Sequence, residues 1–239
     1  MATKESAKGL GTDYEVQTRQ YSIHLVGVTP LIMHRDNFSF TEKINRWRSD
    51  PENKKISTAG DDRSPAWTWI GYLYDDQGKV GISSDNLMTM LREAGAKLYT
   101  GKGKETFKRP TQYGLTVDQV QLPLLVDGKE IATDWIEKLV GVKDFTKHEA
   151  AVEAHGFELF AKRAVVGHAK HVRVRPRFQQ WEVTGTITVL DEEESGLTQE
   201  ILTKILTIGG SRCGLCDWRP SSGSAGSYGK FKAEINLLN

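Results

Sequence analysis

Trp181-Glu-Val-Thr-Gly-Thr-Ile-Thr-Val-Leu190 is a β-prone run in which apolar and polar residues alternate, as is typical of a half-buried strand. An acidic turn, Asp191-Glu-Glu-Glu194, leads from it into a run of helical character, Leu197 to Ile208. A glycine-rich loop, Gly209 to Gly229, comes next, and a short strand, Lys230 to Leu238, follows the loop. These residues predict a strand–helix–strand unit with an unusually long loop before its last strand.

The earlier part of the sequence supplies matching elements. Gln20 to Val28 alternates like a strand, and Gln119 to Val126 is extended. Trp67 to Tyr74 and Lys79 to Ile82, separated by a turn, predict a hairpin. Ser83-Ser84 caps a predicted helix whose apolar face carries Leu87, Leu91, Ala94 and Leu98. We therefore expect an α+β fold: a modified ferredoxin-like or RRM-like antiparallel sheet with helices on one face and long insertions.

The domain organisation follows from the segments that lack such patterns. Residues 1–13 are polar and predict a flexible tail. Residues 14–239 then form one domain, with insertions at about 34–66 and 100–178. The first insertion holds one possible helix, Thr41 to Trp47, and the second a short helix that Thr133 or Asp134 could cap.

Composition limits the function. The 239 residues carry a formal net charge of only +1, so a nucleic-acid site has to be a local patch. No run of 18 apolar residues and no secretory signal is visible. Two cysteines give no disulfide framework. We expect a cytoplasmic protein that does not enter a membrane.

The strongest charge pattern lies between Glu158 and Glu182, where there are six basic residues and no acid. Arg173, Arg175 and Arg177 alternate, so in a strand they project from one face and can follow the phosphates of a nucleic acid. The alternative is a solvated face or ion pairs with acids elsewhere. The other three basic residues are Lys162, Arg163 and Lys170.

The glycine-rich loop adds a second candidate. Its glycines allow close backbone approach and an anion-binding concavity of amides. Trp218 and Tyr228 offer stacking surfaces for bases. No Gly-Lys-Ser/Thr triplet is present, which disfavours nucleotide hydrolysis. The alternative is a flexible surface loop. The further expected phosphate contacts are Arg212, Arg219 and Lys230, together with Lys102, Lys104, Lys108 and Arg109 from a basic turn.

Two weaker patterns could carry chemistry. Cys213 and Cys216 have the spacing of half a zinc site or a redox pair, but a structural zinc needs four ligands, so incidental cysteines are the better interpretation. His34 and Asp36 follow the first strand and could support phosphodiester cleavage, although no further partner can be identified. We expect no cofactor.

Three separated motifs resemble one family. They are Gly27-Val-Thr-Pro-Leu31 after the first strand, the helix start Val80-Gly-Ile-Ser-Ser-Asp-Asn-Leu-Met-Thr-Met-Leu-Arg92, and the glycine-rich loop before the last strand. In this order they resemble the RAMP superfamily, in particular the backbone (palm-and-thumb) subunits of CRISPR effector complexes. The family's Pro-Gly before the serines is absent. An alternative is therefore a distant relative of the family from a phage or a mobile element.

The resemblance implies an RRM-like fold whose copies stack head-to-tail along a single strand through backbone contacts. It also implies other effector-complex subunits as partners, a role in antiviral defence, and a prokaryotic or phage-infected cell. Some members cleave RNA with an aspartate in the region of Asp36, but the motif around that aspartate is missing here. The leading hypothesis is a single-stranded nucleic-acid-binding protein, with RNA favoured. The alternatives are an endoribonuclease using His34 and Asp36, and a structural or inhibitory assembly protein.

Overall fold

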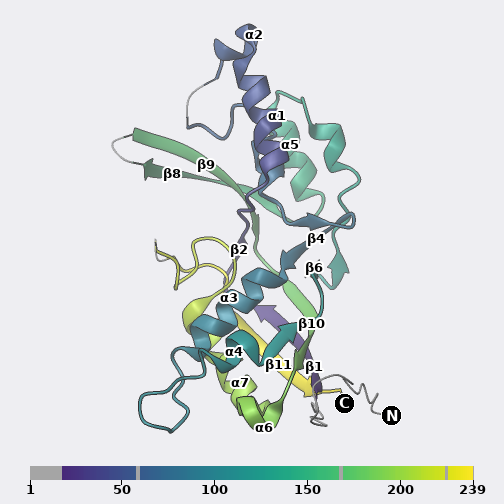
Figure 1. Cartoon of the computed structure of the whole chain (residues 1–239). Coiled ribbons are helices and arrows are strands. Elements are labelled where there is room, and N and C mark those ends of the chain that lie inside the picture. The colour runs from purple at the N-terminus through teal and green to yellow at the C-terminus, as the bar shows by residue number, and fades with distance from the viewer. Residues whose placement is uncertain (1–17, 58–59, 167–168, 224–225, 239) are drawn as a thin grey trace, which may run out of the picture.

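The chain forms an α+β fold with two antiparallel sheets. The computed structural model describes residues 18–57, 60–166, 169–223 and 226–238, so the expected tail at 1–13 lies outside the described residues. A large sheet of eight strands forms the lower part of the body in Figure 1, and a sheet of three strands lies above it. The described residues contain seven α-helices: α1 (Phe38–Ser49), α2 (Pro51–Lys54), α3 (Ser84–Gly95), α4 (Pro110–Tyr113), α5 (Phe145–Glu153), α6 (Glu192–Ser195) and α7 (Gln199–Ile208).

The large sheet is built around β1. Its strands run in the order β11-β1-β10-β6-β4-β3, with β5 paired to β10 and β7 paired to β6. Ile23 lies opposite Gly185 on one side and Ile235 on the other, and both pairings are antiparallel. The strands are β1 (Arg19–Gly27), β3 (Asp75–Asp76), β4 (Lys79–Ser83), β5 (Leu115–Val117), β6 (Gln121–Val126), β7 (Lys129–Glu130), β10 (Glu182–Val189) and β11 (Phe231–Leu237).

Helices α3 and α7 pack together against one face of this sheet. Tyr21, Ile23 and Leu25 of β1 are buried on that face, as the alternation of the sequence predicts. The Ser83 hydroxyl accepts the Asp85 amide and begins α3, which confirms the predicted serine cap. Leu87 and Leu91 then point from α3 into the core.

The opposite face of the large sheet is open and polar. On β1 it carries Gln20, Ser22 and His24, and His24 lies 2.7 Å from Glu182 of β10. β10 adds threonines at 184, 186 and 188, and β11 adds Lys232, Glu234 and Asn236. Among the described residues of these three strands, no Phe, Tyr or Trp lies on this face, and the His24 imidazole is engaged by Glu182. These three strands therefore offer a base few stacking surfaces.

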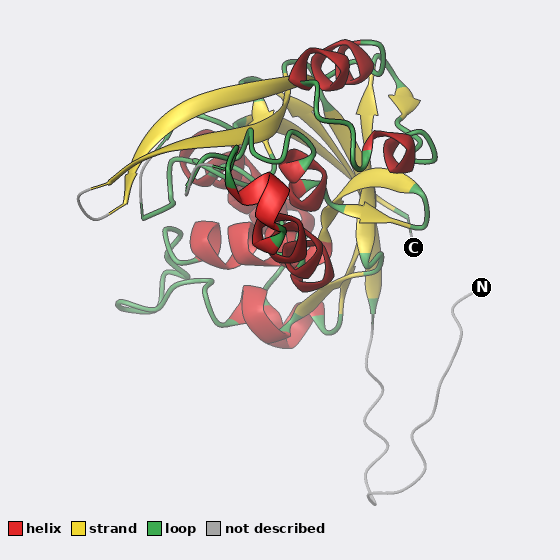
Figure 2. Ribbon diagram, turned by 90° about the horizontal axis from the view of Figure 1, so that it is seen from above, coloured by secondary structure: helices red, strands yellow, loops and turns green. Residues whose placement is uncertain are grey.

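The small sheet consists of β2 (Leu31–Ile32), β9 (Ala169–Phe178) and β8 (Glu158–Val166), in that order. β8 and β9 form a long hairpin that extends away from the body, which Figures 1 and 2 both show. Near the free end of β9, the segment 60–62 pairs with Val172 through backbone hydrogen bonds. The basic stretch of the sequence thus forms most of a projecting two-stranded ribbon.

The structure corrects the predicted hairpin at Trp67 to Tyr74. Thr68–Tyr72 is a 3-10 helix, η1, and only Asp75–Asp76 pairs with β4. A strand would place Trp67 and Trp69 on one face, but the two rings pack in different directions. Trp67 contacts Phe40 of α1, whereas Trp69 contacts His148 of α5, and a helical turn allows both.

The insertions contain more helix than the sequence indicates. α1 includes the predicted Thr41–Trp47 and is longer, beginning at the Asn37 cap, where the Asn37 side chain accepts the Phe40 amide. The helix expected after Thr133 is a 3-10 turn, η2 (Ile136–Leu139). α5 was not predicted, because only His148 and Val152 of its residues are buried and its apolar face is short.

The glycines after α7 are needed for close packing. α7 continues into a π-helical turn, η3 (Gly209–Cys213). A Cβ atom on Gly210 would lie 2.1 Å from the Phe231 carbonyl oxygen, and one on Gly209 would lie 2.1 Å from the Met90 sulfur. A side chain at either position would push α7 away from β11 or α3.

We predict that His148 of α5 makes the stability of the protein depend on pH. Its Nδ1 accepts the Trp69 Nε1–H at 3.1 Å, and its Nε2 lies 2.9 Å from the Val142 carbonyl. Burial lowers the pKa of His148 from its ordinary 6.5. The unfolded chain therefore takes up a proton before the folded chain does, and the free energy of unfolding falls as the pH drops below 6.5.

Urea unfolding at several pH values between neutral and mildly acidic measures this loss. One histidine contributes at most about 1.4 kcal/mol per pH unit. His148→Gln should reduce the pH dependence more than the control His155→Gln, which replaces a partly exposed histidine nearby. Equal pH dependence in the wild type and His148→Gln would contradict the assignment.

Candidate nucleic-acid interface

A buried arginine of β9 lies where the hairpin meets the rest of the chain. Its Nη1 is 2.8 Å from Asp62 Oδ2, and its Nε is 3.5 Å from Asp217 Oδ2. The guanidinium of this residue, Arg175, also lies 4.0 Å from the centre of the Tyr72 ring. The Arg175 and Asp62 side chains are only 5% and 3% exposed.

This geometry changes the role expected of the arginine row. The register confirms that Arg173, Arg175 and Arg177 share one face of the hairpin. Arg173 and Arg175 both pair with Asp62, however, and Arg177 pairs with Glu158 at 2.7 Å. Burial removes Arg175 from the expected phosphate contacts, because its side chain cannot reach a ligand at the surface. The acids that neutralise the row come largely from distant parts of the chain.

His34 belongs to the same cluster. The Arg175 Nη2 lies 3.4 Å from His34 Nε2, and Asp217 Oδ2 lies 3.7 Å from His34 Nδ1. Burial and the charge of Arg175 lower the pKa of His34, so its neutral form is favoured. Since the arginine faces Nε2, that nitrogen is the acceptor, and it is not free to take a proton from a substrate. The arrangement does not favour His34 as a catalytic base.

Aromatic rings and cations gather beside this cluster, on the same face of the hairpin. Phe160 of β8 lies 6.2 Å from Trp218 and 6.1 Å from Tyr228, both in the loop between η3 and β11. Lys162 Nζ lies 4.6 Å from the Trp218 ring centre, and the Arg177 guanidinium lies 4.0 Å from that of Phe160. Lys162 is exposed and the two loop aromatics are half-buried. We call these five residues the hairpin–loop cluster.

The other residues predicted to contact phosphates lie outside the hairpin–loop cluster. Lys162 and Arg163 are exposed and make no ion pair with a described residue, but Arg163 lies on the opposite face of the hairpin. The side chain of Lys170 lies outside what the structure describes. In Figure 1 the hairpin, the glycine-rich loop and the loop after α3 project to the same side of the body. That last loop exposes Lys102, Lys104, Lys108 and Arg109, and Arg212 of η3 is exposed as well.

The glycine-rich loop is more ordered than expected. The amides of Gly214, Gly226 and Gly229 donate to carbonyls of Gly209, Arg219 and Pro30. They are therefore not available for the predicted anion-binding concavity. Arg219 also pairs internally, with Glu93 of α3 at 2.8 Å. Lys230 is half-buried, and its amide donates to Thr29 Oγ1.

The cysteines are buried free thiols. Burial raises the pKa of Cys216 to about 12 and also raises that of Cys213. A thiol that keeps its proton is a poor nucleophile and metal ligand. Within the described residues, no group of three or more histidine, cysteine or acidic side chains is placed to hold a metal ion.

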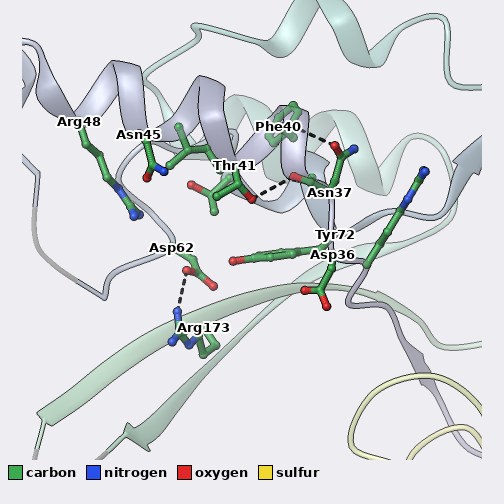
Figure 3. Close-up of a pocket in the computed structure, with 13 residues that line it drawn as sticks. Asp36, Asn37, Phe40, Thr41, Asn45, Arg48, Asp62, Tyr72 and Arg173 are labelled. Atoms are coloured by element: carbon green, nitrogen blue, oxygen red, sulfur yellow. Dashed lines mark hydrogen bonds and ion pairs between the residues drawn. The ribbon is translucent and has the colours of Figure 1, made fainter.

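A polar pocket of about 140 Å³ lies on the other side of the Arg175 cluster, between α1 and β9. Asp36 borders it, as do Asn45 and Arg48 of α1. Tyr72 and Arg173 complete its floor near Asp62, as Figure 3 shows. Asp36 is exposed at the pocket, whereas His34 faces Arg175. The side chains of the two weak catalytic candidates therefore do not converge on a common site.

Several important residues were missed at the sequence level. Asp62, Tyr72 and Asp217 looked like ordinary loop residues, and Phe160 was not noticed beside the basic stretch. One signal was present: an acid-free run of six cations in a nearly neutral chain requires partners elsewhere. Which acids provide them depends on long-range contacts that the sequence does not display.

Comparison with known proteins adds no identification. No protein-family model matches the chain, and no curated protein matches it. In the part of the chain that the structure describes, no helix is long and apolar enough to cross a membrane.

We predict that Arg175 is essential for stability. Arg175→Met leaves the Asp62 carboxylate buried beside fewer donors, and breaking a buried pair in this way costs about 3–5 kcal/mol. The control is Arg63→Met, which removes an exposed ion pair with Asp61 and should cost less than about 1 kcal/mol. Urea unfolding of both variants measures the difference, and similar losses would show that the Arg175 centre is not structural.

Proposed function

We propose that this chain binds single-stranded nucleic acid, RNA in preference to DNA, through the hairpin–loop cluster. The observation that carries the proposal is the cluster itself: three aromatic rings and two basic side chains gathered where the loop before β11 meets one face of the projecting ribbon. Proteins that bind single strands without sequence preference combine aromatic stacking surfaces with a basic groove. A partly exposed set of rings beside an exposed lysine has this character.

The distribution of charge supports the same face. Arg173, Arg175 and Arg177 are engaged by acids, whereas Lys162 and the loop after α3 leave their charges to solvent. These unpaired cations lie on the side to which the hairpin projects. Neutralising phosphates there would release counterions and drive binding. The open face of the large sheet is polar, and the described residues of β1, β10 and β11 place no Phe, Tyr or Trp on it, which makes it the weaker candidate.

We place the core of the chain in the ferredoxin-like or RRM-like class. The order β11-β1-β10 followed by β5 and β6, with α3 and α7 on one face, supports this assignment. It is the arrangement expected of a β-α-β-β-α-β unit. The segment 34–66 would then be one insertion into that unit, and the parts of 100–178 outside β5 and β6 would be the other, which contains the β8–β9 hairpin.

Assembly of copies along one strand is part of the proposal. The resemblance to RAMP backbone subunits suggests head-to-tail stacking, cytoplasmic location and other effector-complex subunits as partners. The projecting hairpin is consistent with this role, because a ribbon that extends from one copy can reach a neighbouring copy on the same strand.

Binding of a fluorescent single-stranded RNA at increasing salt tests the interface. Affinity should fall as salt rises, because each phosphate contact on a single strand contributes about −0.7 to the log–log slope. Lys162→Glu should weaken binding and reduce the slope, and Trp218→Ala should weaken binding about tenfold through lost stacking. DNA of the same sequence should bind more weakly than RNA.

The matched control is Lys232→Glu, which makes the same change on the open face of the large sheet. It should leave the affinity almost unaltered. If Lys232→Glu weakens binding more than Lys162→Glu does, the sheet face is the interface and the proposed site is wrong. Salt-independent affinity would contradict phosphate tracking altogether.

The mass of the complex tests assembly along the strand. We expect the number of protein copies per RNA to increase in steps as the RNA is lengthened, measured by light scattering after size exclusion. One copy on every RNA length would contradict multimerisation. A large assembly that forms without any nucleic acid would instead favour a structural or inhibitory assembly protein.

A further inference from the structure

We propose that the pocket between α1 and β9 receives one guanine base of the bound strand. The inference rests on the proposed function and adds a preference for one base to it. At about 140 Å³, the pocket is smaller than the roughly 300–1,000 Å³ of sites that hold drug-sized molecules. It is therefore suited to a single planar ring system rather than to a whole nucleotide chain.

The Tyr72 ring provides a surface on which a base can stack. Arg175 of β9 covers one side of the ring, with its guanidinium 4.0 Å from the ring centre. Figure 3 shows the ring lying between α1 and β9, so its other side faces the pocket and α1. Burial raises the pKa of Tyr72, so the phenol stays protonated and keeps a hydroxyl that can donate or accept.

Hydrogen-bond donors converge beside this ring. Figure 3 shows Asn45 and Arg48 of α1 directed toward the space above Asp62 and Arg173. The Asn45 amide makes no side-chain hydrogen bond to any described residue, although it borders the pocket. Arg48 uses Nε and Nη2 for the Ser64 and Asp61 carbonyls, and its Nη1 makes no hydrogen bond with a described residue. Arginine donors bind the O6 and N7 acceptors of guanine, and the NH2 group of an asparagine can donate to the same acceptors.

The acid at the pocket favours guanine over the other bases. Asp36 borders the same pocket and its side chain is exposed. Guanine presents acceptors at O6 and N7 for the arginines, and it carries an N2 amino donor for a carboxylate. Adenine could use its N6/N7 edge with Asn45, but it lacks O6 and the N2 amino group, and its N6 amino group would face the Arg48 donor. Three arginines, Arg35, Arg48 and Arg173, border the pocket as well as two carboxylates, but Arg173 is already paired with Asp62, and Asp36 opposes a phosphate there.

The pocket lies next to the proposed path of the strand. Arg173, which borders the pocket, pairs across the hairpin with Lys162 of the hairpin–loop cluster. Directly opposite residues on one face of a hairpin have Cβ atoms about 4.5–5.5 Å apart. A strand that stacks on Trp218 beside Lys162 can therefore turn a neighbouring base across the ribbon into the pocket.

Anisotropy measurements with two short RNAs test this inference. One is oligouridine and the other is the same oligomer with a single central guanosine. Wild-type protein should bind the guanosine-containing RNA about fivefold more tightly, as one additional hydrogen bond from the free Arg48 Nη1 or the Asn45 amide allows. Asn45→Ala should remove most of this difference without changing the affinity for oligouridine. Because Asn45 is exposed within α1, alanine there should not disturb the fold.

The matched control is Ser49→Ala, an exposed polar residue one turn later on α1 that does not border the pocket. It should keep the full preference. Free guanosine should compete away the preference, whereas inorganic phosphate should not.

The outcomes separate this inference from the proposed function. If wild-type protein binds both RNAs equally, the base pocket is wrong and nucleic-acid binding stands. If phosphate competes as well as guanosine, the pocket is an anion site and the inference is overturned. If neither RNA binds, the proposed function and this inference both fail.

Discussion

The contact between Arg175 and Asp62 holds together parts of the chain that are far apart in sequence. Arg175 belongs to the hairpin, Asp62 and Tyr72 to the first insertion, and Asp217 to the loop before β11. The loop is fixed further by the Asp217 amide, which donates to the Ile32 carbonyl. Two buried charges with these partners are tolerated only while the partners remain in place. The positions of the hairpin, α1 and the loop relative to the large sheet therefore depend on this centre.

The centre also divides the basic residues into two groups. Arg173, Arg175 and Arg177 of β9 are paired with acids and position structure, whereas Lys162 and Arg163 of β8 keep their charge for solvent or a ligand. The aromatic rings lie at the boundary, with Phe160 between Arg177 and the Trp218–Tyr228 pair. A ligand that reaches this boundary meets stacking surfaces first and free cations around them. The pocket beside Tyr72 lies on the other side of the Arg175 cluster, between α1 and β9.

Prediction from sequence was accurate where local pattern and tertiary packing agree. β1, α3, β10, α7 and β11 each bury one regular apolar face, so their periodicity is visible in the sequence. It was wrong at Trp67 to Tyr74, because β-prone aromatics there bury in two directions from a 3-10 turn. The glycine-rich loop looked like a source of free amides, but several of those amides bond internally because the loop packs against Pro30 and α3. The arginine row was located correctly, and the register confirms its shared face.

The sequence by itself determined the α+β class, the central strands and their helices, the one-faced row of arginines and the presence of aromatics in the loop before the last strand. These features follow from periodicity and composition, which are local properties. Only the tertiary structure decided which charges are neutralised, that Arg175 is buried, that Phe160 joins Trp218 and Tyr228, and that a pocket opens beside Tyr72. The physical reason is that burial and charge pairing depend on residues distant in sequence. Asp62 and Arg175 are 113 positions apart in the chain, and no local pattern connects them.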